Sequence, residues 1–359
     1  MIGPMSVDDW TADRVPASVV HLDVAGSGRV SRAVLDTEVA HLHREAALGA
    51  YVAQERASPV IDAGRAALGA LVGLGADDVA FSDGAGRAFA TLITAWPLPR
   101  GARIGTVPSE YGSNARVLDQ LARERGWHLV VLPVDDAGRI VDVPADLDLV
   151  TFPQIASQRG IAQPVAHVFA SGTPILLDVA QALGQTPVPP GCAAYVGTSR
   201  KWLCGPRGVG FAIVDPVVQA ALSEPPTLEA LSETGIRRWE NSEAHVAGRV
   251  GLAAALEQWT PELLPRVHRL AATARSVLDG VAGWVVREPV DEPTGITTLS
   301  GGDPFGTRAG LLEEGFLTSA IPTSRSADLD APVLRVSTAS WVEDQQIDAF
   351  AQALAARTK

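Results

Sequence analysis

The sequence has little of what marks several common classes of protein. It holds two cysteines among 359 residues, Cys192 and Cys204, which cannot form a disulfide framework. This scarcity favours a reducing compartment, so we expect a cytoplasmic protein. Lysine and arginine number 29 against 41 aspartates and glutamates, which gives a formal net charge of −12. Because the positive charges are few and scattered, we expect neither nucleic acid nor an anionic membrane as a partner.

Long apolar runs are absent as well. No apolar stretch is long enough to cross a bilayer, and the N-terminus lacks the basic-then-apolar layout of a signal peptide. Residues 1–4 precede a second methionine, Met5, and are left out of the fold prediction. His41 and His43 lie two positions apart in a helical stretch, so they do not share a helix face and we predict no metal site.

Apolar residues make up 47% of the chain, enough for a large core. Short apolar runs alternate with helical stretches, one of them predicted at residues 58–72, up to about residue 214. This alternation predicts an α/β fold with a mostly parallel sheet and helices on both faces. After Pro225 the pattern changes to two long helices followed by short strands and helices. We therefore predict a large domain at residues 50–255 and a smaller α/β domain made of residues 5–49 with 256–359.

Two short apolar runs carry the polar residues of most interest. The run at 174–177 predicts a buried strand that ends at Asp178, with Gln181 just behind it. The run at 193–197 predicts another strand, which leads to Thr198, Arg200 and Lys201. Ligands of open α/β sheets bind beyond the strand ends. We therefore expect a carboxylate, an amide and an amine to meet in one crevice.

A glycine-rich turn lies upstream of these strands. A predicted strand at 78–81 runs into residues 82–87, and a helix is predicted to begin near Ala88. A strand, a glycine-rich turn and a helix N-terminus together form an anion cradle, because unpaired N–H groups and the positive end of the helix dipole point at one spot. The turn matches neither a Walker A loop nor G-x-G-x-x-G, so an ordinary strand-to-helix turn is an alternative.

The combination of these groups suggests a particular chemistry. Lys201 precedes the apolar Trp202 and Leu203, and partial desolvation lowers the pKa of an amine and frees it as a nucleophile. A nucleophilic lysine, a fixed carboxylate and a phosphate cradle are what pyridoxal phosphate (PLP) catalysis needs. Taken singly, Lys201 could be a surface lysine and Asp178 a turn residue. Their order along the chain, with the cradle upstream, favours the PLP interpretation.

The same residues resemble a known family. Asp178-Val179-Ala180-Gln181 followed by Thr198-Ser199-Arg200-Lys201 resembles the D-x-x-Q and S-x-H-K signatures of class V aminotransferase-fold enzymes, which have PLP fold type I. The stretch after the family lysine, the turn at 159–165 and Leu334-Arg335-Val336-Ser337 are similar too. The resemblance covers nearly the whole chain. It implies PLP as the cofactor, a seven-stranded-type sheet in the large domain, and a homodimer.

The resemblance also implies roles for single residues. Lys201 would form the Schiff base with the cofactor and move the substrate proton, and Asp178 would pair with the pyridine nitrogen. Gln181 would reach the phenolic oxygen, and Tyr111 replaces the histidine that stacks on the ring. The remaining implied contacts are of three kinds. The phosphate would be contacted by Thr198, Arg200, Ala85, Gly86 and Arg87, and also by Ser242 from a loop of the partner subunit. The substrate would be contacted by Arg335, Gly26 and Gln154.

The choice of reaction depends on the absence of a cysteine from one segment. Cysteine desulfurases carry a mobile-loop cysteine before the C-terminal arginine, but residues 315–334 contain none, so desulfuration is not expected. Residues 22–28, 109–114 and 237–242 resemble the sub-family of hercynylcysteine sulfoxide lyases. That resemblance implies a small amino-acid sulfoxide as the substrate and β-elimination to a sulfenic acid or thiol (ergothioneine), pyruvate and ammonia. An epimerase, an aminotransferase and a non-catalytic PLP-binding regulator remain as alternatives.

The trimethylammonium group of such a substrate suits an aromatic face. Trp239, Tyr51 and Trp341 are the candidates, with ordinary packing as the alternative for each of them.

Overall fold

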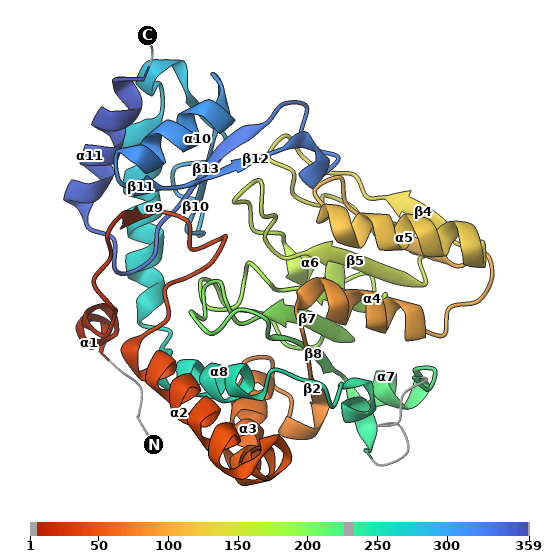
Figure 1. Ribbon diagram of the computed structural model, residues 1–359. Helices are drawn as coiled ribbons and strands as arrows, with labels where there is room; N and C mark the ends of the chain where they lie inside the picture. Colours follow the sequence, from red (N-terminus) through yellow and green to blue (C-terminus); the bar gives the residue numbers. More distant parts are fainter. Residues whose placement is uncertain (1–5, 226–232, 358–359) are drawn as a thin grey trace.

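The computed structural model describes residues 6–225 and 233–357, and residues 1–4 therefore lie outside the described part. Two sheets lie in two parts of the molecule (Figure 1). The larger sheet occupies the centre right of the view, and the smaller one lies at the upper left, next to the C-terminal helix. The proposed division at residues 50–255 stays a prediction.

The larger sheet has seven strands in the order β2-β8-β7-β6-β5-β3-β4. β8 is antiparallel to both of its neighbours, whereas the pairs from β7 to β4 are parallel, so the expected mostly parallel α/β sheet is confirmed. The strands are β2 (Val79–Ser82), β3 (Arg103–Thr106), β4 (His128–Val131), β5 (Leu149–Pro153), β6 (Ile175–Asp178), β7 (Ala194–Thr198) and β8 (Gly210–Val214).

Each face of this sheet packs into its own core. Successive side chains of a strand point to opposite faces. In β6, Leu177 belongs to the core that includes helices α3 (Ala50–Ala70) and α8 (Val246–Gln258), while Leu176 belongs to the core that includes α4 (Ala85–Ala95) and α5 (Gly112–Arg125). Both faces are covered, which explains why the strands read as continuous apolar runs without alternation.

The smaller sheet is antiparallel, with the order β12-β13-β10-β9. Its strands are β9 (Val285–Val286), β10 (Ile296–Ser300), β12 (Ser319–Ile321) and β13 (Val333–Ser337), and α9 (Leu263–Leu278), α10 (Pro304–Glu313) and α11 (Asp344–Ala355) lie in the same part of the chain. A two-stranded pair, β1 (Val20–His21) with β11 (Phe316–Leu317), ties the N-terminal arm to it. The remaining helices are α1 (Val7–Ala12), α2 (Arg32–Leu48), α6 (Val165–Phe169) and α7 (Pro216–Ala221).

Two helix starts were predicted wrongly. The helix expected at 58–72 begins at Ala50, directly after Gly49, whose φ of 85° separates it from α2. Pro59 lies inside this helix, in its third turn. The helix expected near Ala88 begins at Ala85. Because of this shift, Ala85, Gly86 and Arg87 belong to the first turn of the helix and not to the loop before it.

Among the described residues, no helix is both long and apolar enough to span a membrane.

Candidate active site

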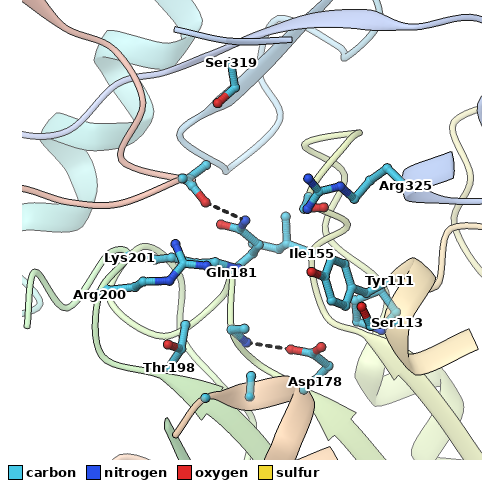
Figure 2. Close-up of a pocket in the computed structure, with 18 of the residues that line it drawn as sticks. Tyr111, Ser113, Ile155, Asp178, Gln181, Thr198, Arg200, Lys201, Ser319 and Arg325 are labelled. Carbon is cyan, nitrogen blue, oxygen red and sulfur yellow. Dashed lines mark hydrogen bonds between the residues drawn. The ribbon is translucent and has the colours of Figure 1, made fainter. Parts of the chain in front are cut away.

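A cavity of about 530 Å³ lies beyond the carboxyl ends of β2, β3, β5, β6 and β7. The smaller sheet contributes Ser319, Ala320 and Ile321 from β12, and Arg325 reaches in from the short 3-10 helix Thr323–Arg325. Figure 2 shows Arg325 and Tyr111 on one side of this space and Arg200 with Thr198 on the other. The cavity is therefore enclosed by residues from both sheets.

Asp178 and Lys201 line this cavity together, as the two predicted strands required. Asp178 is 7% exposed; its Oδ1 accepts a hydrogen bond from the Ala180 N–H at 2.9 Å, and its Oδ2 accepts one from the Asn114 side-chain amide at 3.0 Å. Burial raises the pKa of the Asp178 carboxyl, while Lys201 and these donors oppose the rise. The carboxylate is thus fixed in direction by two donors.

Lys201 is adapted to act as a nucleophile. Burial is the main cause that lowers its pKa to about 7 from the ordinary 10.5. Asp178 opposes this change, whereas the arginines Arg200, Arg335 and Arg325 add to it. At neutral pH a substantial fraction of the amine is therefore unprotonated, as a Schiff-base lysine requires.

The glycine-rich turn opens onto the cavity. Gly84, Ala85 and Gly86 line it, and α4 begins there with no side chain capping its first N–H groups. A Cβ built at Gly84 or Gly86 would meet no atom within 4 Å, so there is open space in front of the turn. On the opposite side Gly210 of β8 packs so closely that a Cβ there would lie 2.3 Å from Gly84.

The other residues of the phosphate side come from the ends of β7 and β8. Thr198, Arg200, Arg207 and Gly208 all line the cavity with the turn. Free backbone N–H groups, a hydroxyl and two guanidinium groups form a set that suits a phosphate. The residues present therefore fit the phosphate of PLP at one end of the cavity, with Lys201 and Asp178 available for its ring.

Gln181 and Tyr111 line the same cavity. The Gln181 amide donates to the Ala25 carbonyl at 3.0 Å, and its Oε1 accepts from the Trp202 indole at 2.8 Å, so both ends of this side chain are held. The Tyr111 ring lies 5.4 Å from the Arg325 guanidinium carbon. The Tyr111 ring thus lies at the wall of the cavity, and its stacking on a cofactor ring stays a prediction.

Arg335 reaches the cavity from β13. It is 3% exposed, and its guanidinium donates to the Ser157 carbonyl and to Asp23 Oδ1, each at 2.9 Å. Its Nε is buried and has no partner. Asp23 begins the loop that contains Gly26, another residue of the cavity wall. An arginine held in this way has a donor left over for a carboxylate.

Comparison with known proteins decides the family. The family model of aminotransferase class V matches residues 20–299. The chain belongs to this family. It is 38% identical to a probable hercynylcysteine sulfoxide lyase of Mycobacterium tuberculosis, in an alignment that covers 99% of this chain and 94% of the relative.

Solved structures of known proteins are similar in fold. An apo cysteine desulfurase from Thermococcus onnurineus NA1 matches with a TM-score of 0.85 at 16% identity, covering 99% of this chain and 98% of the other. The cystine C–S lyase C-DES in complex with cysteine persulfide matches with a TM-score of 0.83 at 18% identity, covering 94% and 97%. The expected fold type I is confirmed. The family is PLP-dependent, so the expectations of an enzyme and of PLP as its cofactor are confirmed at the level of the family.

Two of the residues expected at this class V site lie elsewhere. Arg87 is exposed and lines a different pocket, because α4 begins at Ala85 and its third residue turns away from the cradle. Gln154 is buried and its amide donates to the Pro187 carbonyl, so it points away from the cavity that its neighbours Pro153 and Ile155 line. Ser242, which is expected to act from the partner subunit, is exposed and lies outside the cavity of its own chain, so its role stays a prediction.

The aromatic candidates for a trimethylammonium group do not line the cavity either. Tyr51 is 78% exposed on α3, and Trp239 borders the separate pocket near Arg87. Trp341 is buried and stacks edge-on with His21 at 5.9 Å between ring centroids. None of these three aromatic side chains therefore contributes to the wall of the cavity.

Sequence reasoning missed several residues of the site. Arg207 and Arg325 line the cavity, and Asn114 and Glu110 are buried behind Asp178. The i, i+4 spacing of Glu110 and Asn114 at the start of a helix could have indicated their contact. No local pattern marks Arg325, because the fold alone brings its loop over the larger sheet.

Proposed function

We propose that this protein is a PLP-dependent carbon–sulfur lyase that cleaves hercynylcysteine sulfoxide by β-elimination. The observation that carries the proposal is the meeting of Lys201 and Asp178 in one cavity with an open phosphate cradle. The substrate is suggested by the 38% identical relative, a probable hercynylcysteine sulfoxide lyase. When bound, PLP would supply an electron sink for the charge that develops at the substrate Cα.

The residues of the cavity would have separate roles in binding and catalysis. Thr198, Arg200 and the turn at Gly84 would hold the phosphate, and Asp178 would keep a proton on the pyridine nitrogen. Arg335 would bind the substrate α-carboxylate. The Lys201 amine, with a pKa of about 7, would take the proton from the substrate Cα.

The bond that breaks is the one between Cβ and sulfur, and the leaving group is a sulfenate, which leaves more readily than a thiolate. Proton transfer to it gives the sulfenic acid. The three-carbon fragment takes up water and yields pyruvate and ammonia. An external thiol reductant would then convert the sulfenic acid into the thiol ergothioneine and water.

A desulfurase reaction is the competing interpretation within this fold. Residues 315–334 contain no cysteine, and in the structure both Cys192 and Cys204 are free and buried. Burial raises the pKa of the Cys204 thiol to about 11, so this group is a poor nucleophile at neutral pH. A buried thiol in this state does not suit persulfide formation.

The proposal is tested by giving the holoenzyme two substrates separately. With hercynylcysteine sulfoxide we expect pyruvate, and with L-cysteine we expect no alanine, the product of desulfuration. Alanine from L-cysteine would favour a desulfurase. A keto acid that retains its sulfur would favour an aminotransferase, and the D-amino acid an epimerase. Bound PLP with no product from either substrate would favour a regulatory protein.

A homodimer is the second part of the proposal. Exposed apolar side chains follow α2 and α3, which lie at the lower edge of the molecule (Figure 1): Leu35, Val39, Leu42, Tyr51, Val52 and Val60. Leu35, Val39 and Leu42 share one face of α2 by their helical spacing. A second copy of the chain would cover this surface and bring its exposed Ser242 loop to the neighbouring cradle.

The substitution Val39→Glu is expected to weaken the dimer at least about tenfold, because it would place an unpaired charge in the interface. Analytical ultracentrifugation measures this effect. Val217→Glu on α7, where the valine is 79% exposed, is the matched control and should leave the dimer unchanged. A monomeric wild-type protein at micromolar concentration would contradict the proposal.

A further inference from the structure

A buried carboxyl group stands behind Asp178 and is not used by the steps above. Glu110 lies between β3 and α5 and is 3% exposed. Its Oε1 accepts a hydrogen bond from the Tyr111 N–H at 2.8 Å and another from the Asn114 side-chain amide at 3.1 Å. The same Asn114 nitrogen donates to Asp178 Oδ2 at 3.0 Å. One amide group therefore joins two carboxyl groups.

We propose that Glu110 and Asn114 are positioning residues that set the direction of the Asp178 carboxylate and the start of the Tyr111 segment at the cofactor ring. This inference rests on the proposed use of PLP. The geometry supports it because a single oxygen, Glu110 Oε1, receives donors from both directions. A shift of that oxygen would move Tyr111 and Asn114 together. Tyr111 would lie at the face of the cofactor ring, and Asn114 holds Asp178, the proposed partner of the ring nitrogen.

The charge of Glu110 matters for this role. Burial, and secondly the negative charge of Asp178, raise the pKa of Glu110 to about 8. Its Oε2 is buried without a donor, which also disfavours the ionised form. The titratable group that interacts electrostatically with Glu110 is Asp178, which in turn interacts with Lys201. Lys201 also interacts with the positive charges of Arg200, Arg335 and Arg325. At pH 7 Glu110 therefore keeps its proton in most molecules.

The neutral state of Glu110 has a consequence for the apoprotein. The unfolded chain loses this proton near the ordinary pKa of 4.5, whereas the folded protein keeps it up to about pH 8. Between these values the folded state holds more protons, so the stability contributed by Glu110 falls as the pH rises. Glu110→Gln removes the titrating group and preserves the shape of the side chain.

We expect the melting temperature of the wild-type apoprotein to fall between pH 5 and pH 7 by more than that of Glu110→Gln. Glu124→Gln, an exposed position on α5, is the matched control and should behave as the wild type. Equal pH profiles for wild type and Glu110→Gln would overturn the charge assignment. If Glu110→Gln does not fold, Glu110→Met, which also removes the titrating group, takes its place, and a pH profile equal to that of the wild type would overturn the assignment.

The positioning role is tested with PLP itself. Asn114→Ala removes the donor from Asp178 and should weaken PLP binding about tenfold and shift the pH titration of the bound cofactor's absorbance. Glu110→Gln should bind PLP within about threefold of wild type, since it keeps an oxygen acceptor. Wild-type binding and spectrum in Asn114→Ala would overturn the role. Failure of the proposed function would look different, because PLP would bind normally and no pyruvate would form.

Discussion

Replacing Lys201 with alanine is expected to abolish covalent attachment of PLP and to lower pyruvate release by at least about 10³-fold, because the amine that would take the substrate proton is removed. Lys201 and Lys359 are the only lysines of the sequence. Lys359 is therefore the one other lysine that could substitute for Lys201. The absorbance of the bound cofactor, with mass spectrometry after borohydride reduction, measures attachment directly.

The matched control for this experiment is Lys359→Ala, which removes the other lysine and should leave both attachment and turnover unchanged. Pyruvate release at the wild-type rate by Lys201→Ala would remove Lys201 from the proton-transfer role. Covalent attachment that persists in Lys201→Ala and disappears in Lys359→Ala would move the Schiff-base lysine to the C-terminus.

Replacing Arg335 with alanine is expected to raise KM roughly 10²-fold, because truncating a buried guanidinium removes charged hydrogen bonds to the substrate carboxylate. The effect on kcat should be smaller, since in the proposed role Arg335 would bind the substrate both before and during the reaction. Steady-state kinetics with pyruvate detection separates the two constants. The change also leaves Asp23 without its ion-pair partner at 2.9 Å, so thermal stability is measured in parallel.

Arg335→Lys is the companion variant. It keeps a positive charge but loses the planar fork, so its KM should lie between those of wild type and Arg335→Ala. An unchanged KM in a folded Arg335→Ala would show that the α-carboxylate binds elsewhere. Arg325 and Arg200, which also line the cavity, would then be the candidates.

The sequence predicted the centre of the site because local patterns determine it. Asp178 and Lys201 each follow a short apolar run, and the register of β6 with β7 brings those runs side by side. Parallel neighbouring strands end at the same edge of a sheet, so no knowledge of distant contacts was needed. The cradle was found for a similar reason, since a strand, a turn and a helix follow one another directly.

The periphery of the site depends on contacts between distant segments, which a local pattern does not contain. The pair of Arg335 with Asp23 joins residues 312 positions apart. Arg87 was misplaced by an error of three residues in one helix start, since each helical residue turns the side-chain direction by about 100°. Glu110 was overlooked because only the fold shows that its carboxyl group is buried beside that of Asp178.

The proposed function stands or falls with cleavage of a carbon–sulfur bond by β-elimination at the Lys201 site. In the most direct measurement, the PLP-loaded wild-type protein is incubated with hercynylcysteine sulfoxide and excess thiol reductant, and pyruvate and ergothioneine are both quantified. We expect equal amounts of pyruvate and ergothioneine. A keto acid or a D-amino acid with the carbon–sulfur bond intact, or bound PLP without any product, would contradict it.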